Sequence, residues 1–248
     1  RSTGKLVSYI NDGADYRGGN NDATLDNTNR TMLGKPATQQ TTEYFRAAAR
    51  KNGTGWLCTT MRHTAAIAVL FGDSCGESSY EVKKDDGTVV YTAKIPSFFG
   101  YKNGFGNLWR MMDDEQVQCN EDTSVTHLVA PSIYGTWTLG NADGMVAYSK
   151  SETNGEGYIQ ELCMEHLENF PTKKGGTEST YWTSYFWNTS GATSGFRLCL
   201  RGGNANNGGQ CGLSTLNVNN AVSDYNVNYG AALNLTRYCR LVCLAAVI

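Results

Sequence analysis

The side chains that most often carry out catalysis are few and scattered in this sequence. Its three histidines, His63, His127 and His166, lie far apart in the chain, and neither a GxSxG nor an HExxH motif occurs. One carboxylate cluster is present, at residues 113–115, and we interpret it as a solvated turn. His63 lies one turn before Ile67 on an apolar helical stripe, so we expect it in the core or at a helix end. The sequence therefore indicates no catalytic residues.

Metal and cofactor chemistry has equally little support. The eight cysteines form no CxxC pair, and Cys239 and Cys243 are four residues apart without a nearby histidine, so no zinc site is predicted. Scattered cysteine spacing favours buried free thiols over a disulfide scaffold, which stays open as the alternative. The glycine-rich segment near the C-terminus lacks the GK[ST] ending of a phosphate-binding loop. We expect neither a metal nor a cofactor.

Charge and hydropathy restrict the classes of partner. The chain of 248 residues has a formal net charge of -2 and its densest basic runs are pairs, Lys83-Lys84 and Lys173-Lys174. Nucleic-acid binding usually needs a basic stripe, so it is not expected. No run of about 18 apolar residues exists, which argues against membrane insertion.

The predicted helices and strands, which would position any functional site, indicate one α+β domain over residues 1–248. We predict a strand at 5–10, a helix at 42–52 ending at Gly53, a brief strand in GTGWLCTT, and a second helix at 61–71 capped by Gly72. Alternation about Asp86-Gly87 predicts a hairpin. VTHLVAP, TWTL and MVAYSK are candidates for further short strands. Early helices followed by many short strands are typical of an α+β fold.

The most unusual stretch is residues 201–235, which holds nine asparagines and no lysine, glutamate or histidine. In LNVNN, Leu216 and Val218 alternate with asparagines, and in YNVNYG, Val227 stands between Asn226 and Asn228. This spacing predicts that one face packs and the other displays amides. Asparagine is disfavoured in ordinary strands, so repeated alternation needs a firm scaffold with turns. A solvated Asn/Gly-rich loop is the simpler alternative.

Several motifs, taken in order, resemble a known family. They are RGGNND, TMLGKP, FRAAARKNGTGW, GFGNLWRM, GFRLCLRGGNANNG and NVNYGAALNL. Together they cover about residues 17–235 and are similar to the variable proteins of diversity-generating retroelements, above all those of gut bacteria and their phages. The resemblance implies a C-type lectin fold of the formylglycine-generating-enzyme type, with two helices and a mixed, mostly antiparallel core of short strands. It also implies error-prone reverse transcription that changes adenine-rich codons such as those of asparagine.

The resemblance further implies a non-catalytic, extracellular protein on a phage tail tip or bacterial cell surface. Its partner would be a host cell-surface protein or glycan, and a trimer would suit a tail tip by analogy. Within the hypervariable region 201–235 we predict a ligand-binding face. It comprises Asn204, Asn206, Asn207, Gln210, Ser214, Asn217, Asn219, Asn220, Asp224, Tyr225, Asn226, Asn228 and Tyr229.

The aromatic run YWTSYFW just before this region gives a further prediction. Alternation places Trp182, Ser184 and Phe186 on one side of a strand, and Tyr181, Tyr185 and Trp187 on the other. Core packing is the default for both sides. Tyr185 and Trp187 are candidates for the rim of the binding face, where rigid aromatic side chains anchor ligands.

Two other functions compete with this interpretation. A calcium-dependent lectin would bridge sugar hydroxyls through a calcium ion, but the prolines at 36, 96, 131 and 171 do not form the expected Glu-Pro-Asn signature. An oxidase of the formylglycine-generating type would need a cysteine pair and copper. GFRLC is similar to the ending of those enzymes, but the asparagine-rich segment follows it and no matched cysteine pair is evident.

Overall fold

A computed structural model describes residues 38–74, 77–83, 89–96, 105–106, 108–132, 137–177, 179, 184–188 and 195–235. The predicted strand at 5–10, the hairpin turn at Asp86-Gly87 and residues 181–183 of the aromatic run lie outside these ranges. Within the described ranges the chain forms two α-helices and many strands, so the predicted α+β class is confirmed. No helix among the described residues is long and apolar enough to cross a membrane.

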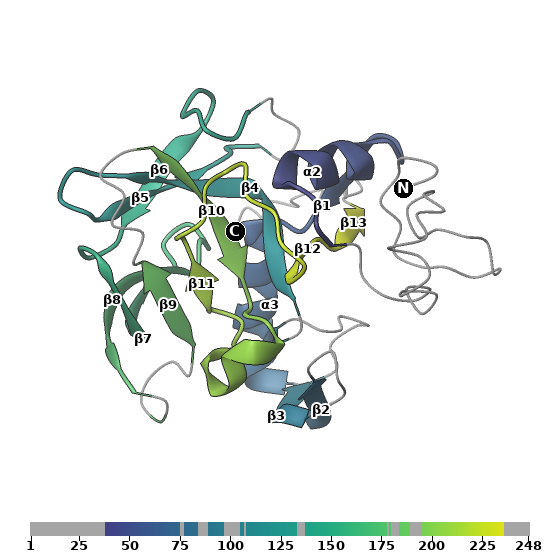
Figure 1. Ribbon diagram of the computed structural model, residues 1–248, viewed down its shortest axis with the longest axis vertical. Coiled ribbons are helices and arrows are strands. Elements are labelled where there is room, and N and C mark those ends of the chain that lie inside the picture. Colours follow the sequence, from purple (N-terminus) through teal and green to yellow (C-terminus); the bar gives the residue numbers. More distant parts are fainter. Residues whose placement is uncertain are drawn as a thin grey trace, which may run out of the picture.

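The helices lie early in the chain and most strands follow them (Figure 1). The helical elements are α2 (Thr42–Arg50), α3 (Met61–Ser74) and the 3-10 helix η2 (Ala205–Gln210). The strands before residue 150 are β1 (Trp56–Cys58), β2 (Glu77–Lys83), β3 (Val89–Pro96), β4 (Trp109–Cys119), β5 (Val125–Val129) and β6 (Val146–Lys150). The later strands are β7 (Gly155–Cys163), β8 (Phe170–Gly176), β9 (Tyr185–Asn188), β10 (Phe196–Arg201), β11 (Leu216–Asn217), β12 (Tyr229–Gly230) and β13 (Leu233–Leu235).

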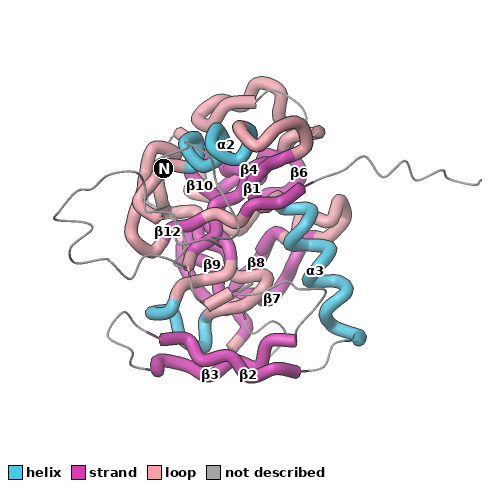
Figure 2. The backbone as a smooth tube through the Cα atoms, turned by 90° about the vertical axis from the view of Figure 1, so that its right-hand side faces the viewer, coloured by secondary structure: helices cyan, strands magenta, loops and turns pink. Residues whose placement is uncertain are grey.

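One large sheet organises the described part of the chain. Its strand order is β6-β5-β4-β10-β11-β9-β7-β8, with β12 paired to β4. Most pairs are antiparallel, but β11 runs parallel to β9 and β12 runs parallel to β4. The early strand β1 pairs with the late strand β13, and β2 pairs with β3 in a separate hairpin. Figure 2 shows this hairpin at the opposite end of the molecule from α2.

Helix α2 forms as its sequence predicts. The Thr41 side chain accepts a hydrogen bond from the Tyr44 amide, which satisfies a donor that a helix start leaves free. Phe45, Ala48 and Ala49 are buried on the face that packs on the sheet. The helix ends at Arg50, two residues before the predicted end.

Helix α3 is longer than its sequence predicted. It passes through Gly72 and ends at Ser74, so the predicted cap at Gly72 is wrong. A single glycine inside a helix costs only about 1 kcal/mol, which the surrounding helix can offset. His63 lies in its first turn, half-buried, with Nδ1 2.7 Å from the Thr60 hydroxyl. Burial lowers the pKa of His63, and its place at a helix end agrees with the prediction.

The acidic run at 113–115 is not a solvated turn, and this prediction is wrong. All three carboxylates are buried within β4, the longest strand. Leu200 of β10 pairs with Met111, but Leu198 pairs with Gln116, so the acidic run falls at a register shift in β4. Such bulges redirect side chains. Each carboxylate therefore meets a different part of the fold, where it accepts hydrogen bonds from groups distant in the sequence.

Other strand predictions have mixed outcomes. The hairpin β2–β3, the brief strand β1 and the strands β5 and β6 are present where alternation indicated. TWTL was expected as a strand, but the described residues 137–139 lie outside the strands. Strands β7 and β8 were missed because glycines, glutamates and lysines obscure their alternation.

Two buried apolar clusters lie on opposite faces of the sheet. The first, beneath α2, includes Phe45, Trp109 and Leu200. The second includes Ile159 and Phe186. Residues adjacent in a strand point to opposite faces, so β4 and β10 supply side chains to both clusters. This arrangement fixes the strands that carry the candidate site.

Candidate ligand-binding surface

The alternation in LNVNN is present as predicted. Leu216 and Val218 are buried in the second cluster, whereas Asn217 and Asn219 are half-buried on the other side. Strand β11 holds this segment between β10 and β9, with Asn217 paired to Leu200 on one side and to Trp187 on the other. Apolar residues thus fix the backbone while amides occupy the opposite face.

After β11 the chain crosses the sheet, and we name residues 218–228 the crossing segment. The Val218 amide bonds to the Trp187 carbonyl, and the Leu198 amide bonds to the carbonyl of Asn220. Further along, the Asn228 carbonyl accepts from the amide of Trp109 at 2.8 Å. Figure 1 shows this segment in yellow passing over β10 and β4 before it reaches β12. Backbone hydrogen bonds at both ends therefore fix its path.

A side-chain network braces the crossing segment. The Asp224 carboxylate accepts from the Asn220 amide group at 2.8 Å, and the Tyr229 hydroxyl lies 3.5 Å from it. The Asp224 carboxylate also accepts from the backbone amide of Tyr225 at 2.9 Å. Burial, with a smaller effect of the Asp224 charge, raises the pKa of Tyr229 to about 12. The phenol is therefore neutral at physiological pH and donates to Asp224.

The second asparagine-rich element is η2, which follows β10. Gly202 and Gly203 have φ angles of 91° and 78°, which favour glycine and let the chain turn. Asn204 caps the helix through the Asn206 amide, and the Asn207 side chain accepts from the Asn204 amide at 2.8 Å. This reciprocal arrangement is a capping box formed by two asparagines.

The predicted residues do not all face solvent, and the prediction is corrected at three of them. Asn204, Ser214 and Tyr229 are buried: Asn204 caps η2, Ser214 donates to the Asn169 side chain at 2.9 Å, and Tyr229 packs in the first cluster. The predicted inward side chain Val227 is instead 55% exposed. Alternation fails there because residues 222–228 cross the sheet rather than extend a strand.

The predicted residues also do not share one surface. Asn206, Asn207 and Gln210 lie in η2, which contacts the β2–β3 hairpin. Asn219, Asn220, Asp224, Tyr225, Asn226 and Asn228 lie in the crossing segment, and the Asn226 carbonyl accepts from the Gln39 amide before α2. Figures 1 and 2 both place η2 toward the hairpin end of the molecule. Among all thirteen, the exposed residues are Asn206, Tyr225 and Asn226.

Strand β9 links these two groups. Phe186 is 1% exposed and Ser184 is buried, whereas Tyr185 and Trp187 are half-buried on the opposite face, as alternation predicted. The Tyr185 amide donates to the Thr215 hydroxyl, which in turn donates to the carbonyl of Gln210 at the end of η2. Trp187 lies beside Asn217. The two rim candidates thus lie between η2 and the crossing segment.

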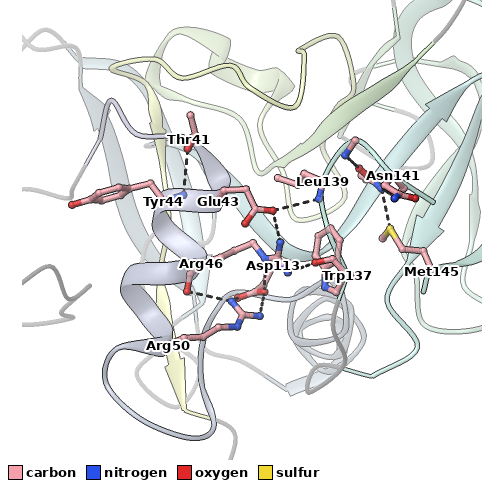
Figure 3. Close-up of polar contacts among 12 residues, drawn as sticks. Thr41, Glu43, Tyr44, Arg46, Arg50, Asp113, Trp137, Leu139, Asn141 and Met145 are labelled. Carbon is pink, nitrogen blue, oxygen red and sulfur yellow. Dashed lines mark hydrogen bonds and ion pairs between the residues drawn. The ribbon is translucent and has the colours of Figure 1, made fainter. Parts of the chain in front are cut away.

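The acidic run, which the sequence analysis underestimated, is the strongest electrostatic feature of the described residues. Asp113 accepts from Arg46 and Arg50, which lie one turn apart on α2 (Figure 3). It also accepts from the Cys58 amide. The Arg46 guanidinium also lies 3.8 Å from the centre of the Trp137 ring. This carboxylate fastens α2 to both β4 and β1.

Glu115 forms a fully buried ion pair with Arg201. The Arg201 guanidinium donates to both Glu115 oxygens, and also to the carbonyls of Glu168 and Asn169 at 2.9 and 2.8 Å. Burial alone would raise the pKa of Glu115, but the charge and hydrogen bonds of Arg201 lower it to about 2. Glu115 is therefore ionised over the physiological pH range.

His127 completes this buried cluster. Its Nε2 lies 2.7 Å from Glu115, and its ring stacks on Phe170 with the two centroids 4.4 Å apart. Burial lowers the pKa of His127 despite the nearby carboxylate, so the neutral ring donates from Nε2. Glu115, His127 and Cys199 bring possible ligand atoms within 4.8 Å of one another. Because Arg201 and His127 already bind both Glu115 oxygens, this arrangement fits an ion-pair network better than a cation site.

Asp114 differs from its two neighbours. One oxygen accepts from the Met61 amide at the start of α3, and the other has no hydrogen-bond partner among the described residues. Burial, together with the Glu115 charge, raises its pKa to about 7. A perturbed carboxyl of this kind can indicate catalysis, but Asp114 is 1% exposed and has no access to substrate. We assign it a structural role.

Four of the described cysteines have thiols that their surroundings keep protonated. Cys58, Cys163, Cys199 and Cys211 all have thiol pKa values raised chiefly by burial, with Cys211 reaching about 12. All five described cysteines are free thiols, as the spacing predicted. Thiolate is the nucleophilic form, so these residues are poor candidates for thiol chemistry.

Comparison of the sequence with models of protein families finds no match. A comparison with curated proteins finds none that is similar. The interpretation of the surface therefore rests on the geometry described above and on the motifs.

Proposed function

We propose that this chain is a non-catalytic ligand-binding protein whose segment 201–235 supplies a recognition surface on a fixed framework. The observation that carries the proposal is the separation over Leu216–Asn219: Leu216 and Val218 are buried, while Asn217 and Asn219 lie on the other face. Surface side chains usually change stability by at most about 0.5 kcal/mol, so exposed residues of the segment such as Asn206 and Tyr225 can vary without loss of the fold.

Side-chain exposure supports some residues of the segment more than others as part of this proposed surface. The crossing segment provides the main part, because Tyr225 is 61% exposed and Asn226 is exposed beside it. Asn206 in η2 provides a second, separate contact region. Buried Asn204, Ser214 and Tyr229 belong to the framework instead. A surface of neutral amides and phenols, without lysine or glutamate, suits hydrogen-bonded recognition.

The wider proposal follows the resemblance to variable proteins of diversity-generating retroelements. In this proposal the α+β fold is a C-type lectin-like domain, and adenine-directed substitution diversifies the segment. The protein acts at a phage tail tip or bacterial surface and binds a host surface protein or glycan. Two helices and a mixed, mostly antiparallel sheet support the fold, and the buried thiols argue against the competing oxidase.

Binding to whole bacterial cells tests the proposal. We would label the protein fluorescently and measure binding to a panel of gut bacterial strains by flow cytometry. A triple alanine variant at Asn206, Tyr225 and Asn226 should lose binding while its thermal unfolding stays nearly unchanged. The matched control is a triple alanine variant at the exposed residues Gln118, Glu121 and Thr153, around the β4–β5 and β6–β7 loops. Equal binding by both variants would contradict the proposed surface.

A further inference from the structure

Four aromatic side chains form a continuous row on one face of the sheet. The Tyr158 and Tyr185 rings lie 5.1 Å apart in an edge-to-face arrangement, and Tyr185 and Trp187 lie 4.4 Å apart. The Trp187 ring then meets Trp109 at 5.3 Å, again edge to face. Trp109 is buried beneath the crossing segment, whereas the other three remain half-buried. The row thus runs from the core out to solvent.

Polar residues flank this row in register. Glu156 of β7 pairs with Trp187, and Asn217 of β11 pairs with Trp187 from the other side. Residues paired in this way point to the same face. Glu156 is exposed, and its charge adds to burial in raising the pKa of Tyr185, which places the carboxylate near the phenol. The rings therefore have a carboxylate and an amide at their edges.

We propose that Tyr158, Tyr185 and Trp187 form a platform that binds a neutral oligosaccharide, with Glu156 and Asn217 binding its hydroxyl groups. The inference rests on the proposed function, because the platform adjoins the recognition surface at Asn217, and it names the class of ligand. A sugar ring offers C–H groups to an aromatic face and hydroxyls at its rim. The platform offers aromatic rings for the C–H groups, and a carboxylate and an amide at its edges for the hydroxyls.

Geometry favours this ligand over the alternatives. The rings touch one another, so they leave no gap for the ammonium group that an aromatic cage surrounds. The Tyr185 centroid lies 5.1 Å from that of Tyr158 and 4.4 Å from that of Trp187, so the three rings form one continuous apolar strip along which a chain of sugars can lie. A protein partner would usually need about 800 Å² of contact, far more than three half-buried rings supply. The Asn217 amide and the Glu156 carboxylate beside the row can both bind hydroxyl groups.

An array of neutral and sialylated oligosaccharides, probed with the labelled protein, tests the inference. We expect wild type to bind neutral structures and Trp187→Ala and Tyr185→Ala to bind at least about tenfold more weakly. Trp187 packs on the first cluster, so its loss can also destabilise the fold. The thermal unfolding of each variant is therefore measured alongside its binding. Glu156→Gln, at an exposed position, gives a second test that leaves packing intact and should also weaken binding. Tyr44→Ala, an exposed aromatic on α2, is the matched control and should bind like wild type.

The outcomes separate this inference from the proposed function. Absence of binding to neutral oligosaccharides, or binding that Trp187→Ala, Tyr185→Ala and Glu156→Gln leave unchanged, would overturn the platform. If cell binding nevertheless depended on Asn206, Tyr225 and Asn226, the proposed function would stand with a protein ligand. If oligosaccharide binding depended on the platform while that triple variant bound cells normally, the platform would stand and the recognition surface would be wrong.

Discussion

The Asn217 carboxamide accepts a hydrogen bond of 2.8 Å from the backbone amide of Asn219. The same pattern recurs at Asn204, whose side chain accepts from the Asn206 amide, whereas the Asn226 side chain accepts from the next residue, Val227. Asparagine forms such turns readily because its side chain mimics a backbone carbonyl. Many asparagines of the segment therefore shape its backbone as well as its surface, so they are not freely interchangeable.

Substitutions at Asn217 should distinguish these two roles. Asn217→Asp keeps an oxygen that can accept from Asn219 and should leave the unfolding free energy within about 0.5 kcal/mol. Asn217→Leu removes the acceptor and should cost about 1 kcal/mol. Denaturant unfolding of both variants checks this prediction. Equal stability would show that the turn does not depend on the side chain.

Neighbouring asparagines in η2 should differ in the same way. Asn204→Ala removes the cap and should lower the unfolding free energy by about 1 kcal/mol. Asn206→Ala, at an exposed position only two residues away, should change it by less than about 0.5 kcal/mol. The pair is best compared by thermal melts under identical conditions. A larger loss at Asn206 than at Asn204 would be inconsistent with the observed capping box.

The buried ion pair should be sensitive to loss of one partner. Arg201→Met leaves Glu115 charged and unpaired in the core, and should destabilise the fold by about 3–5 kcal/mol. Adding Glu115→Gln removes that charge and should recover part of the loss. The exposed pair Lys150–Asp122 is the control, since Lys150→Ala should cost less than about 1 kcal/mol. Chemical denaturation measures the stability of the three variants. An Arg201→Met protein as stable as wild type would contradict the structural role of the Arg201–Glu115 ion pair.

Asp114 should make stability depend on pH in an unusual direction. Its folded pKa of about 7 lies above its ordinary value, so the folded state binds the proton more tightly. This stabilising contribution is fully present below about pH 4 and is lost as the pH rises toward and through 7. Asp114→Asn cannot lose a proton. The variant should therefore gain stability relative to wild type, by about 2 kcal/mol, between pH 5 and pH 8.

Other buried groups also make the stability of the protein depend on pH, and their contributions must be separated from that of Asp114. Glu115 and His127 both have lowered pKa values, so their contributions decline in the opposite direction, as the pH falls. Comparing wild type with Asp114→Asn at each pH cancels them to first order. A stability difference that stayed constant from pH 5 to pH 8 would show that Asp114 does not titrate in this range.

Local periodicity predicted much of the framework. Apolar spacing and caps located α2 and α3 to within a few residues, and alternation assigned the two sides of β9 and of Leu216–Asn219. These features depend on near neighbours in sequence, which is why they can be read directly.

The sequence did not show which buried polar side chains find partners far away in the chain. Asp113, Asp114 and Glu115 look like a surface turn until Arg46, Arg201 and the start of α3 come near them in the fold. The same reason explains Tyr229 and Ser214, which are polar but satisfied by partners elsewhere in the chain. Buried charges need partners of opposite charge, so the acidic run could have been tested against arginines elsewhere in the sequence.

The most direct test of the account is deep sequencing of the gene and its flanking DNA from a replicating population. We predict a near-copy of the segment coding for residues 201–235 beside a reverse transcriptase gene. Substitutions should occur at adenines and alter exposed positions such as Asn206 and Asn226, while the Leu216 and Val218 codons stay unchanged. Substitutions spread evenly along the gene, with no such copy nearby, would contradict the central claim of a rewritable recognition surface.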